Sequence, residues 1–311
     1  MSQTVITCSQ GTIQQMKETY GRSLKQKTPQ GAVFSAKVDG CSITAYRSGK
    51  VMFQGPNHDF EAARWNGNSA SPKKKSSSQQ TTSPYYPKAS LLTSSHGGSD
   101  EAGTGDYFGP ITVASVYVTE EQISTLKKAG VRDSKDLKDP QIQQIAKRLV
   151  ELEIPYSLIT LHNEKYNRLQ RKGWTQGKMK TMLHHAAINK LSEKIAPIKM
   201  EGFVIDQFAE PNIYKRHLYS ENQTLQDNVY FMMKAESHSI AVAAASIIAR
   251  SAFVKQMNKL SDKAGIELPK GASRRVDQTA GALIKQIGAD GLEEFAKVHF
   301  ANTEKALHYV R

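Results

Sequence analysis

A polar, low-complexity segment divides the chain into two parts that must fold separately. From Asn66 to Gly98 the sequence is dominated by Ser, Thr, Gln, Pro and Lys, contains the run SPKKKSSSQQTTSP and has no acidic residue. Such a segment has too little apolar surface to offset the conformational entropy that it would lose on ordering. We therefore predict a flexible basic linker over residues 66–96, a first domain over residues 1–65 and a second over residues 97–311.

The chain also carries an excess of positive charge. Its 311 residues include 42 Lys or Arg and 29 Asp or Glu, which gives a formal net charge of +13 at pH 7. The first third is the more densely basic part, because residues 66–98 add four basic residues and no acidic one. An excess of this size predicts a polyanionic partner, either a nucleic acid or an anionic membrane surface. Within the linker, Lys73, Lys74 and Lys75 could contact phosphate or serve only as solvated charges.

Composition excludes several classes of protein. Two cysteines, Cys8 and Cys41, are too few for a disulfide scaffold or a complete zinc site, and they suit a reducing cytosol. The first residues, MSQTVITCSQ, have neither the basic start nor the apolar core of a secretory signal. No apolar run approaches the roughly 18 to 20 residues that cross a bilayer. We therefore expect a cytoplasmic protein without a membrane partner.

The first domain is predicted to hold one helix followed by a small antiparallel sheet. An apolar stripe at helical spacing consists of Ile13, Met16, Tyr20 and Leu24. Alternating apolar residues predict three strands, over residues 32–38, 41–47 and 50–55. A hairpin turn at Asp39-Gly40 joins the first two strands. Such a unit can lay one face of its sheet on a nucleic acid or merely cover a core.

In the second domain, strand-like and helix-like segments alternate. Strands are predicted over residues 111–118, 155–161, 202–208 and 228–235. Helices are predicted over residues 120–129, 139–151, 176–195 and 239–260. Apolar strands interleaved with helices are typical of an α/β layered domain with a mostly buried sheet.

Acidic residues fall at the ends of these predicted strands or beside them. Asp100 and Glu101 are adjacent within GGSDEAGTGDYFGP, and adjacent carboxylates are unfavourable unless a proton or a cation relieves them. Asp206 ends the strand GFVIDQF, at the edge of the sheet where open α/β folds bind ligands. Glu236 precedes a helix rich in Ala and Ser, where an acid is favourable whatever the function. Taken singly, each acid has an ordinary explanation.

Seven motifs occur in order between residues 97 and 303: DEAGTGDYFGP, RDSKDL, HNEKYNRL, VIDQF, KAESHSIAVAAASIIAR, LPKGAS and KVHFANT. Together they resemble ribonuclease HIII, a bacterial type 2 ribonuclease H related to ribonuclease HII. The helix and sheet of the first domain resemble the TBP-like substrate-binding domain of that family, although only YRSGKVMFQG is similar in sequence there. The resemblance implies an RNase H-like α/β fold with a mixed central sheet flanked by helices, plus a small N-terminal α+β TBP-like domain.

The same resemblance implies an activity and a cofactor. It implies a metal-dependent endoribonuclease that hydrolyses the RNA strand of RNA/DNA hybrids and leaves 5′-phosphate and 3′-hydroxyl ends. We separately expect the protein to be a monomer. The implied metal-binding acids are Asp100, Glu101, Asp206 and Glu236, and Glu210 competes with Glu236 for the fourth place. Hard oxygen ligands suit Mg²⁺ or Mn²⁺ and disfavour zinc.

Five further residues are implied to contact the substrate. Gly103, Thr104 and Gly105 offer backbone groups to the RNA 2′-hydroxyl, which separates RNA from DNA. Ser134 and Lys135 are placed by the resemblance to contact phosphate, although a helix cap followed by a surface lysine explains them equally simply. Ribonuclease HII has Arg where this chain has Thr104, which predicts poor cleavage at a single embedded ribonucleotide.

Three alternatives remain beside this interpretation. The first is ribonuclease HII-like cleavage at single embedded ribonucleotides, which Thr104, Glu236 in place of Asp and the N-terminal domain disfavour. The second is a non-catalytic nucleic-acid-binding protein, in which four converging acids would only repel the phosphates. The third is a metal-dependent DNA nuclease, which a loop that reads the 2′-hydroxyl disfavours. His299, which stands beside Phe300, is expected to pack and not to react.

Overall fold

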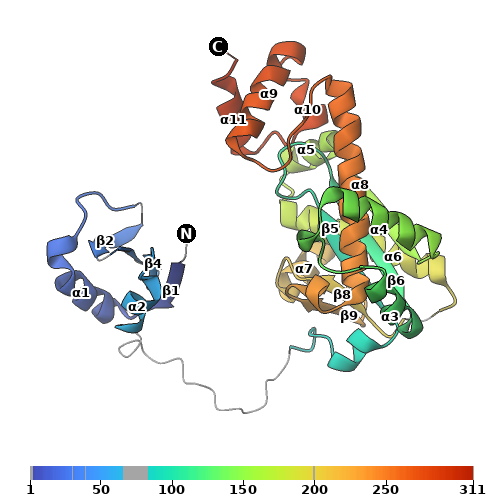
Figure 1. The fold of residues 1–311 in the computed structure, drawn as a ribbon, viewed down its shortest axis with the longest axis horizontal. Helices are drawn as coiled ribbons and strands as arrows, with labels where there is room; N and C mark the ends of the chain where they lie inside the picture. The colour runs from blue at the N-terminus through green and yellow to red at the C-terminus, as the bar shows by residue number, and fades with distance from the viewer. Residues whose placement is uncertain (1–2, 30, 39, 66–82, 199, 311) are drawn as a thin grey trace. The chain divides into compact units, whose positions relative to one another are not determined.

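The structure is a computed structural model that describes residues 3–29, 31–38, 40–65, 83–198 and 200–310 (Figure 1). It divides the chain into two compact units, Met1–Thr81 and Thr82–Arg311, and each is described here by itself. The hairpin residue Asp39 and the linker lysines Lys73, Lys74 and Lys75 lie outside the described residues.

The first unit is built on a four-stranded antiparallel sheet in the order β1-β4-β3-β2. Its elements are β1 (Gln3–Thr7), α1 (Gln10–Thr19), the short 3₁₀ helix η1 (Gly21–Ser23), β2 (Ala32–Val38), β3 (Cys41–Tyr46), β4 (Lys50–Gln54) and α2 (His58–Ala63). The core forms where Ile13 and Met16 of α1 are buried with Phe34, Ile43 and Phe53 of the sheet. The unit therefore has an apolar core of its own.

Two expectations for this unit are wrong. The helix does not come first, because β1 precedes it and pairs with β4. The periodicity of this short edge strand is hidden by its polar residues and by Val5, which is 51% exposed. The helix also ends at Thr19 and does not reach Leu24, because the chain tightens into the 3₁₀ helix η1 at Gly21–Ser23.

The second unit is built on a five-stranded mixed sheet in the order β7-β6-β5-β8-β9. The strands are β5 (His96–Ala102), β6 (Ile111–Val118), β7 (Tyr156–Leu161), β8 (Phe203–Asp206) and β9 (Val229–Met232). The three strands β5, β6 and β7 are antiparallel, whereas β8 and β9 run parallel to β5. The predicted class, a mixed α/β sheet flanked by helices, is confirmed.

Helices cover both faces of this sheet, as Figure 1 shows. The helices are α3 (Glu120–Lys128), α4 (Asp139–Glu151), α5 (Asn163–Arg171), α6 (Gln176–Ile195), α7 (Pro211–Tyr219), α8 (Ile240–Ala264), α9 (Arg274–Ile287), α10 (Leu292–Phe295) and α11 (Ala301–Leu307). Short 3₁₀ helices are η2 (Ala89–Thr93), η3 (Ser134–Asp136) and η4 (Ala235–Ser237). On β6, Ala114 and Val116 pack toward α8, whereas Val113 packs toward α6. Because both faces are covered, every residue of β6 is buried.

The helix α8 is the centre of the larger core. By length and composition this helix could cross a membrane, since an 18-residue stretch of it has a mean hydropathy of 1.3. This finding is contrary to the expectation that the chain has no apolar run of that length. However, 83% of this 18-residue apolar stretch is buried inside the protein, as in the core helix of a globular domain. Its small residues allow close approach to β5: a Cβ at Gly98 would lie 2.2 Å from the backbone nitrogen of Val242.

The last part of the predicted linker packs on the second unit. The ring of Tyr85 contacts that of Phe231 with centroids 6.4 Å apart, and Leu91 is buried with Val204 and Met232. A few apolar side chains thus suffice to anchor this polar segment on the second unit. The average composition of the segment does not reveal them. Of the predicted linker, residues 66–82 lie outside the described residues, and His96 already begins β5.

Candidate active site

Three of the four predicted acids lie at the ends of neighbouring strands. Asp100 and Glu101 lie near the end of the central strand β5, and Asp206 is the last residue of β8. These strands are parallel, and Ser99 pairs with Ile205. The next residues along the two strands are Asp100 and Asp206, so the register brings these carboxylates to the same edge of the sheet.

Glu236 reaches this edge through a tight turn after β9. The chain leaves β9 through Lys234, whose φ of 55° is left-handed, and enters η4, which contains Glu236. The backbone N–H of Ala235 donates to Oδ1 of Asp206 at 2.9 Å. Glu236 also contributes to the raised pKa of Asp206, which places the two carboxyl groups near one another. The structure therefore brings Asp100, Glu101, Asp206 and Glu236 together.

The competing acid Glu210 lies elsewhere. It is exposed and stands at the N-cap of α7, where the side-chain amide of Gln207 donates to it at 3.5 Å. Among the described residues, no hydrogen bond or ion pair joins Glu210 to the other acids. This placement favours Glu236 as the fourth member.

The clustered acids perturb one another. Burial raises the pKa of Asp100 well above its usual range, and the charges of Glu101 and Asp206 raise it further. Burial also raises the pKa of Asp206 to about 6, with further contributions from Glu236 and Glu101. Two carboxyls at this site are thus costly to ionise unless a positive charge is near.

Glu101 is held by two residues of α6. Its carboxylate accepts from Nζ of Lys180 at 2.6 Å and lies 2.9 Å from Nε2 of His184. Burial by itself would raise the pKa of Glu101, but His184 and Lys180 outweigh it and lower the value to about 2. The other ring nitrogen of His184 bonds Oγ of Ser99 at 2.8 Å, so the imidazole is fixed at both ends.

Sequence reasoning did not find these two partners. Lys180 and His184 are four residues apart on a helix, a spacing that puts both on one face. That spacing was the available signal, but nothing in the sequence says which strand the face covers.

Glu236 is held by Lys135, one of the predicted phosphate contacts. Burial would raise the pKa of Glu236, but the ion pair with Lys135 lowers it overall. The lysine side chain is 72% exposed, so it can turn toward a ligand without leaving a core. Its neighbour Ser134 bonds Oγ of Ser246 on α8 at 2.7 Å, which fixes the start of η3 beside the acids.

The donor atoms of the site are all carboxylate oxygens, the ligands that Mg²⁺ and Mn²⁺ prefer. In the part of the chain that the structure describes, no three such side chains stand close enough to hold a metal as they are. Lysines instead neutralise Glu101 and Glu236. Yet Oε2 of Glu236 is buried and receives no hydrogen bond from a described residue, and Asp100 and Asp206 have raised pKa values. These residues therefore fit a divalent cation.

The glycine-rich loop after β5 has a buried base and an open tip. Gly103 has a φ of +89°, and a Cβ there would lie 2.2 Å from the carbonyl oxygen of Pro110, so only glycine fits. Gly105 is exposed, and a Cβ there would meet no atom within 4 Å. The carbonyl of Thr104 accepts from the side chain of Gln176 at 3.0 Å. The tip is thus accessible to a ligand.

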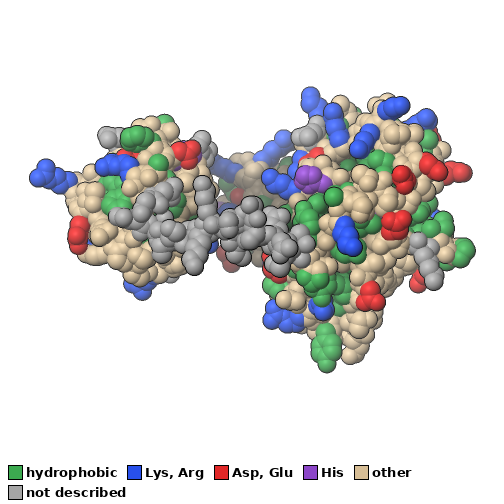
Figure 2. All heavy atoms as spheres, turned by 90° about the horizontal axis from the view of Figure 1, so that it is seen from below, with side chains coloured by type: hydrophobic (Ala, Val, Ile, Leu, Met, Phe, Trp, Pro, Cys, Tyr) green, Lys and Arg blue, Asp and Glu red, His purple; other side chains and the backbone are tan. Residues whose placement is uncertain are grey.

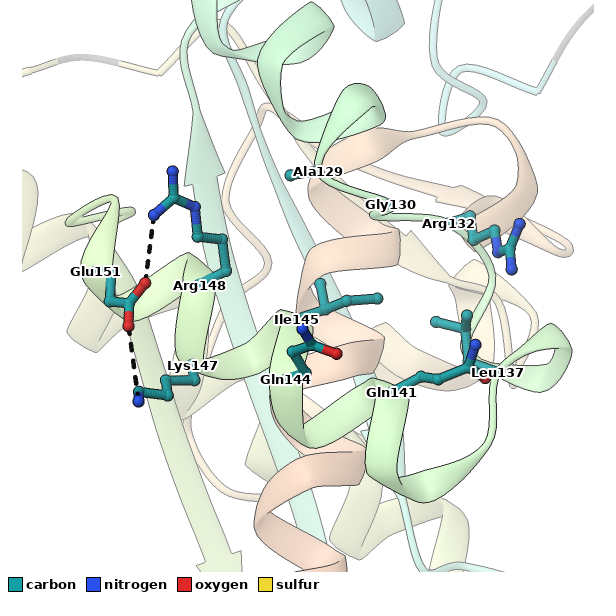
Figure 3. Close-up of a pocket in the computed structure, with 10 residues that line it drawn as sticks. All are labelled: Ala129, Gly130, Arg132, Leu137, Gln141, Gln144, Ile145, Lys147, Arg148 and Glu151. Atoms are coloured by element: carbon teal, nitrogen blue, oxygen red, sulfur yellow. Dashed lines mark hydrogen bonds and ion pairs between the residues drawn. The ribbon is translucent and has the colours of Figure 1, made fainter.

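Two hollows flank η3. Figure 3 shows one of about 610 Å³ beside α4, with Arg132 toward one end and Arg148 and Lys147 paired with Glu151 toward the other. None of the four acids lines it. The second, of about 370 Å³, has a lining of mixed charge that includes Lys127, Arg132, Asp133 and Glu236. Of the four acids, only Glu236 lines this hollow, where Asp133 and Glu236 offset the charges of Lys127 and Arg132.

The chain is similar to proteins of known family. A family model described as Ribonuclease HII matches residues 97–303, and one described as a domain of unknown function matches residues 3–78. A protein named Ribonuclease HIII from Oceanobacillus iheyensis is 56% identical over 98% of this chain and 99% of its own length. One from Bacillus cereus with the same name is 52% identical over 99% and 98%. The crystal structure of Bst-RNase HIII in complex with Mn²⁺ is 41% identical, with a TM-score of 0.70 over 100% of this chain and 99% of that one.

Proposed function

The chain belongs to the ribonuclease HIII family, and from that premise we propose that Asp100, Glu101, Asp206 and Glu236 are its catalytic acids. The protein is a ribonuclease H, a phosphodiester hydrolase that cleaves the RNA strand of RNA/DNA hybrids. The observation that supports the four acids most is their convergence from three separate segments on one edge of the sheet. The resemblance drawn from the seven motifs is confirmed.

Activity depends on a divalent metal, and we infer Mg²⁺ or Mn²⁺. Asp100, Asp206 and Glu236 would hold it, since Asp100 and Asp206 have raised pKa values and Oε2 of Glu236 receives no hydrogen bond from a described residue. When bound, the metal supplies an activated water for in-line attack and stabilises the leaving 3′ oxygen.

The remaining groups of the site bind and orient the RNA strand. Glu101, held by two partners on α6, is rigid enough to sense the ribose 2′-hydroxyl beside the exposed tip at Gly105. Lys135 is exposed and can exchange its bond to Glu236 for one to phosphate. The products would carry 5′-phosphate and 3′-hydroxyl ends.

We also infer how the protein meets its partner. Lys and Arg side chains are spread over the visible face of both units (Figure 2), and the net charge of +13 favours a hybrid duplex. The cysteines Cys8 and Cys41 are free and buried, in keeping with a reducing cytoplasm. A monomer without a membrane partner suffices for this activity, because all four acids come from one chain.

Asp100→Asn tests the assignment directly. We expect it to lower the rate of hybrid cleavage by at least about a hundredfold, because a carboxylate ligand of the metal is lost, while hybrid binding persists on the basic surface. A gel-based assay measures the cleavage rate, and fluorescence anisotropy measures hybrid binding. Glu210→Gln is the matched control and should cut like wild type, whereas Glu236→Gln should be nearly inactive. Asp100→Asn turnover within about tenfold of wild type would remove Asp100 from the centre.

A further inference from the structure

A buried lysine supports the glycine-rich loop from beneath. Lys297 lies between α10 and α11, and its side chain is fully buried. Its Nζ donates to the carbonyl oxygens of Asp106 at 2.7 Å and Gly109 at 2.5 Å. Lysine is almost never fully buried without such partners, because removing its charge from water is costly. Burial indeed lowers the pKa of Lys297 to about 7, and Asp106 opposes that shift.

The chain around Lys297 holds the same loop through its backbone. The N–H of Lys297 donates to the carbonyl of Tyr107 at 2.9 Å. From another side, Gly271 donates to Oδ1 of Asp106 at 2.6 Å, and its carbonyl accepts from the N–H of Tyr107 at 2.9 Å. The loop base is therefore fixed by two distant segments, while the tip at Gly105 is exposed.

We propose that Lys297 is a positioning residue that holds the glycine-rich loop in register with the acids, so that Thr104 and Gly105 meet the RNA 2′-hydroxyl. This inference rests on the proposed function, because it takes residues 103–105 as the segment that reads RNA. Lys297 itself cannot touch the substrate, since its side chain is fully buried.

The physical reason is the pair of carbonyl groups that Lys297 bonds. An apolar side chain of similar length fills the space but leaves the carbonyls of Asp106 and Gly109 buried without this donor. The loop base would then shift toward water or other donors, and the tip would move with it. A displacement of about 1 Å at a reacting group is enough to lower a rate strongly.

The test compares Lys297→Met with Lys305→Met, an exposed lysine on α11, in the full chain. Each variant is given an all-RNA hybrid strand and the same strand with a 2′-fluoro group at the scissile nucleotide. We expect Lys297→Met to lower the RNA preference, the ratio of the two kcat/KM values, on the order of tenfold, the size of one hydrogen bond. Because a ratio does not depend on the folded fraction, general destabilisation would not change it. Lys305→Met and the Mn²⁺ affinity of both variants should match wild type.

A second variant keeps the test decisive if Lys297→Met does not fold. Lys297→Gln keeps a polar donor, which favours folding, but its shorter side chain does not reach the carbonyls of Asp106 and Gly109 as Nζ does. Hydrogen–deuterium exchange should therefore be faster at the amides of residues 104–109 and unchanged in α8. Unaltered exchange in the loop, or an unaltered RNA preference in a folded variant, would overturn the inference. Failure of the proposed function is separate, because it would appear as wild-type protein that does not cut the hybrid, whereas exchange is read without substrate.

Discussion

Two of the candidate acids are neutralised by a lysine and two are not. Glu101 and Glu236 form ion pairs with lysines, and both have lowered pKa values. No described Lys or Arg pairs with Asp100 or Asp206, whose pKa values are raised. The two acids without a lysine partner thus lie on the central strand β5 and on its neighbour β8, where a cation would have the largest effect on their ionisation.

Metal binding should therefore be linked to pH through Asp206. A carboxyl whose pKa is raised in the folded state contributes stability at low pH, and this contribution is lost as pH rises through its folded value, here about 6. Protons compete with the metal for the Asp206 carboxylate below that pH and do so much less above it. We expect Mn²⁺ to raise the Tm more at about pH 7.5 than at about pH 5.

Thermal unfolding with Mn²⁺ or with EDTA at the two pH values measures this difference. Asp206→Asn is the control, because it cannot titrate and should show a smaller dependence on pH. An equal Mn²⁺ shift at both values in wild type would contradict the linkage.

At the scale of elements, the contact of α8 with β5 positions the acids. Gly98 stands two residues before Asp100, and its Cβ would overlap the backbone of α8 near Val242. Backbone atoms cannot rotate aside, so Gly98→Ala should destabilise the fold by about 1 to 3 kcal/mol, as overpacking does. Thermal unfolding tests this against Gly105→Ala, whose Cβ meets nothing within 4 Å and should leave the Tm unchanged. A Gly98→Ala protein as stable as wild type would mean that α8 can move away from β5 at little energetic cost.

Apolar periodicity predicted several of the long, regular elements, but α5, α7, α9, α10 and α11 were not among the predicted helices. The predicted ranges 111–118 and 176–195 match β6 and α6. The helix α5 was missed because Asn163 and Asn167 occupy its buried face and donate to backbone carbonyls around α10. Strand β9 ends earlier than predicted because Lys234 adopts a left-handed conformation.

The four candidate acids could be named from the sequence only through the resemblance of the seven motifs to ribonuclease HIII, because each acid taken singly has an ordinary explanation. Their supports could not be predicted, because they depend on contacts between distant parts of the chain. Lys180 contacts Glu101 over 79 residues, and Lys297 contacts Asp106 over 191 residues. Such contacts follow from the packing of helices on the sheet, which periodicity alone does not specify.

At the scale of the whole molecule, the acids and much of the positive charge belong to different units. Residues 1–81 hold eleven basic and four acidic residues, a net charge of +7 out of +13, whereas all four candidate catalytic acids lie after residue 82. Deleting residues 1–81 should weaken hybrid binding and flatten its salt dependence, because phosphate contacts are lost, while metal-dependent cleavage persists at a lower level. Binding titrations at several salt concentrations measure this, and an unchanged KM in the truncated protein would show that the first unit is not the substrate anchor.

The preferred substrate should be a run of ribonucleotides. A basic first unit that binds along the duplex needs several base pairs of hybrid. Thr104, where ribonuclease HII has Arg, also offers no guanidinium group to hydrogen-bond the phosphates of a DNA–RNA junction. A lone 2′-hydroxyl would therefore engage the tip at Gly105 once, without further contacts. We expect faster initial rates on an all-RNA strand than on a DNA strand with one ribonucleotide, both paired with DNA in Mg²⁺. Thr104→Arg should narrow the gap by speeding cleavage at the single ribonucleotide, and equal rates on the two substrates in wild type would show that Thr104 does not set this preference.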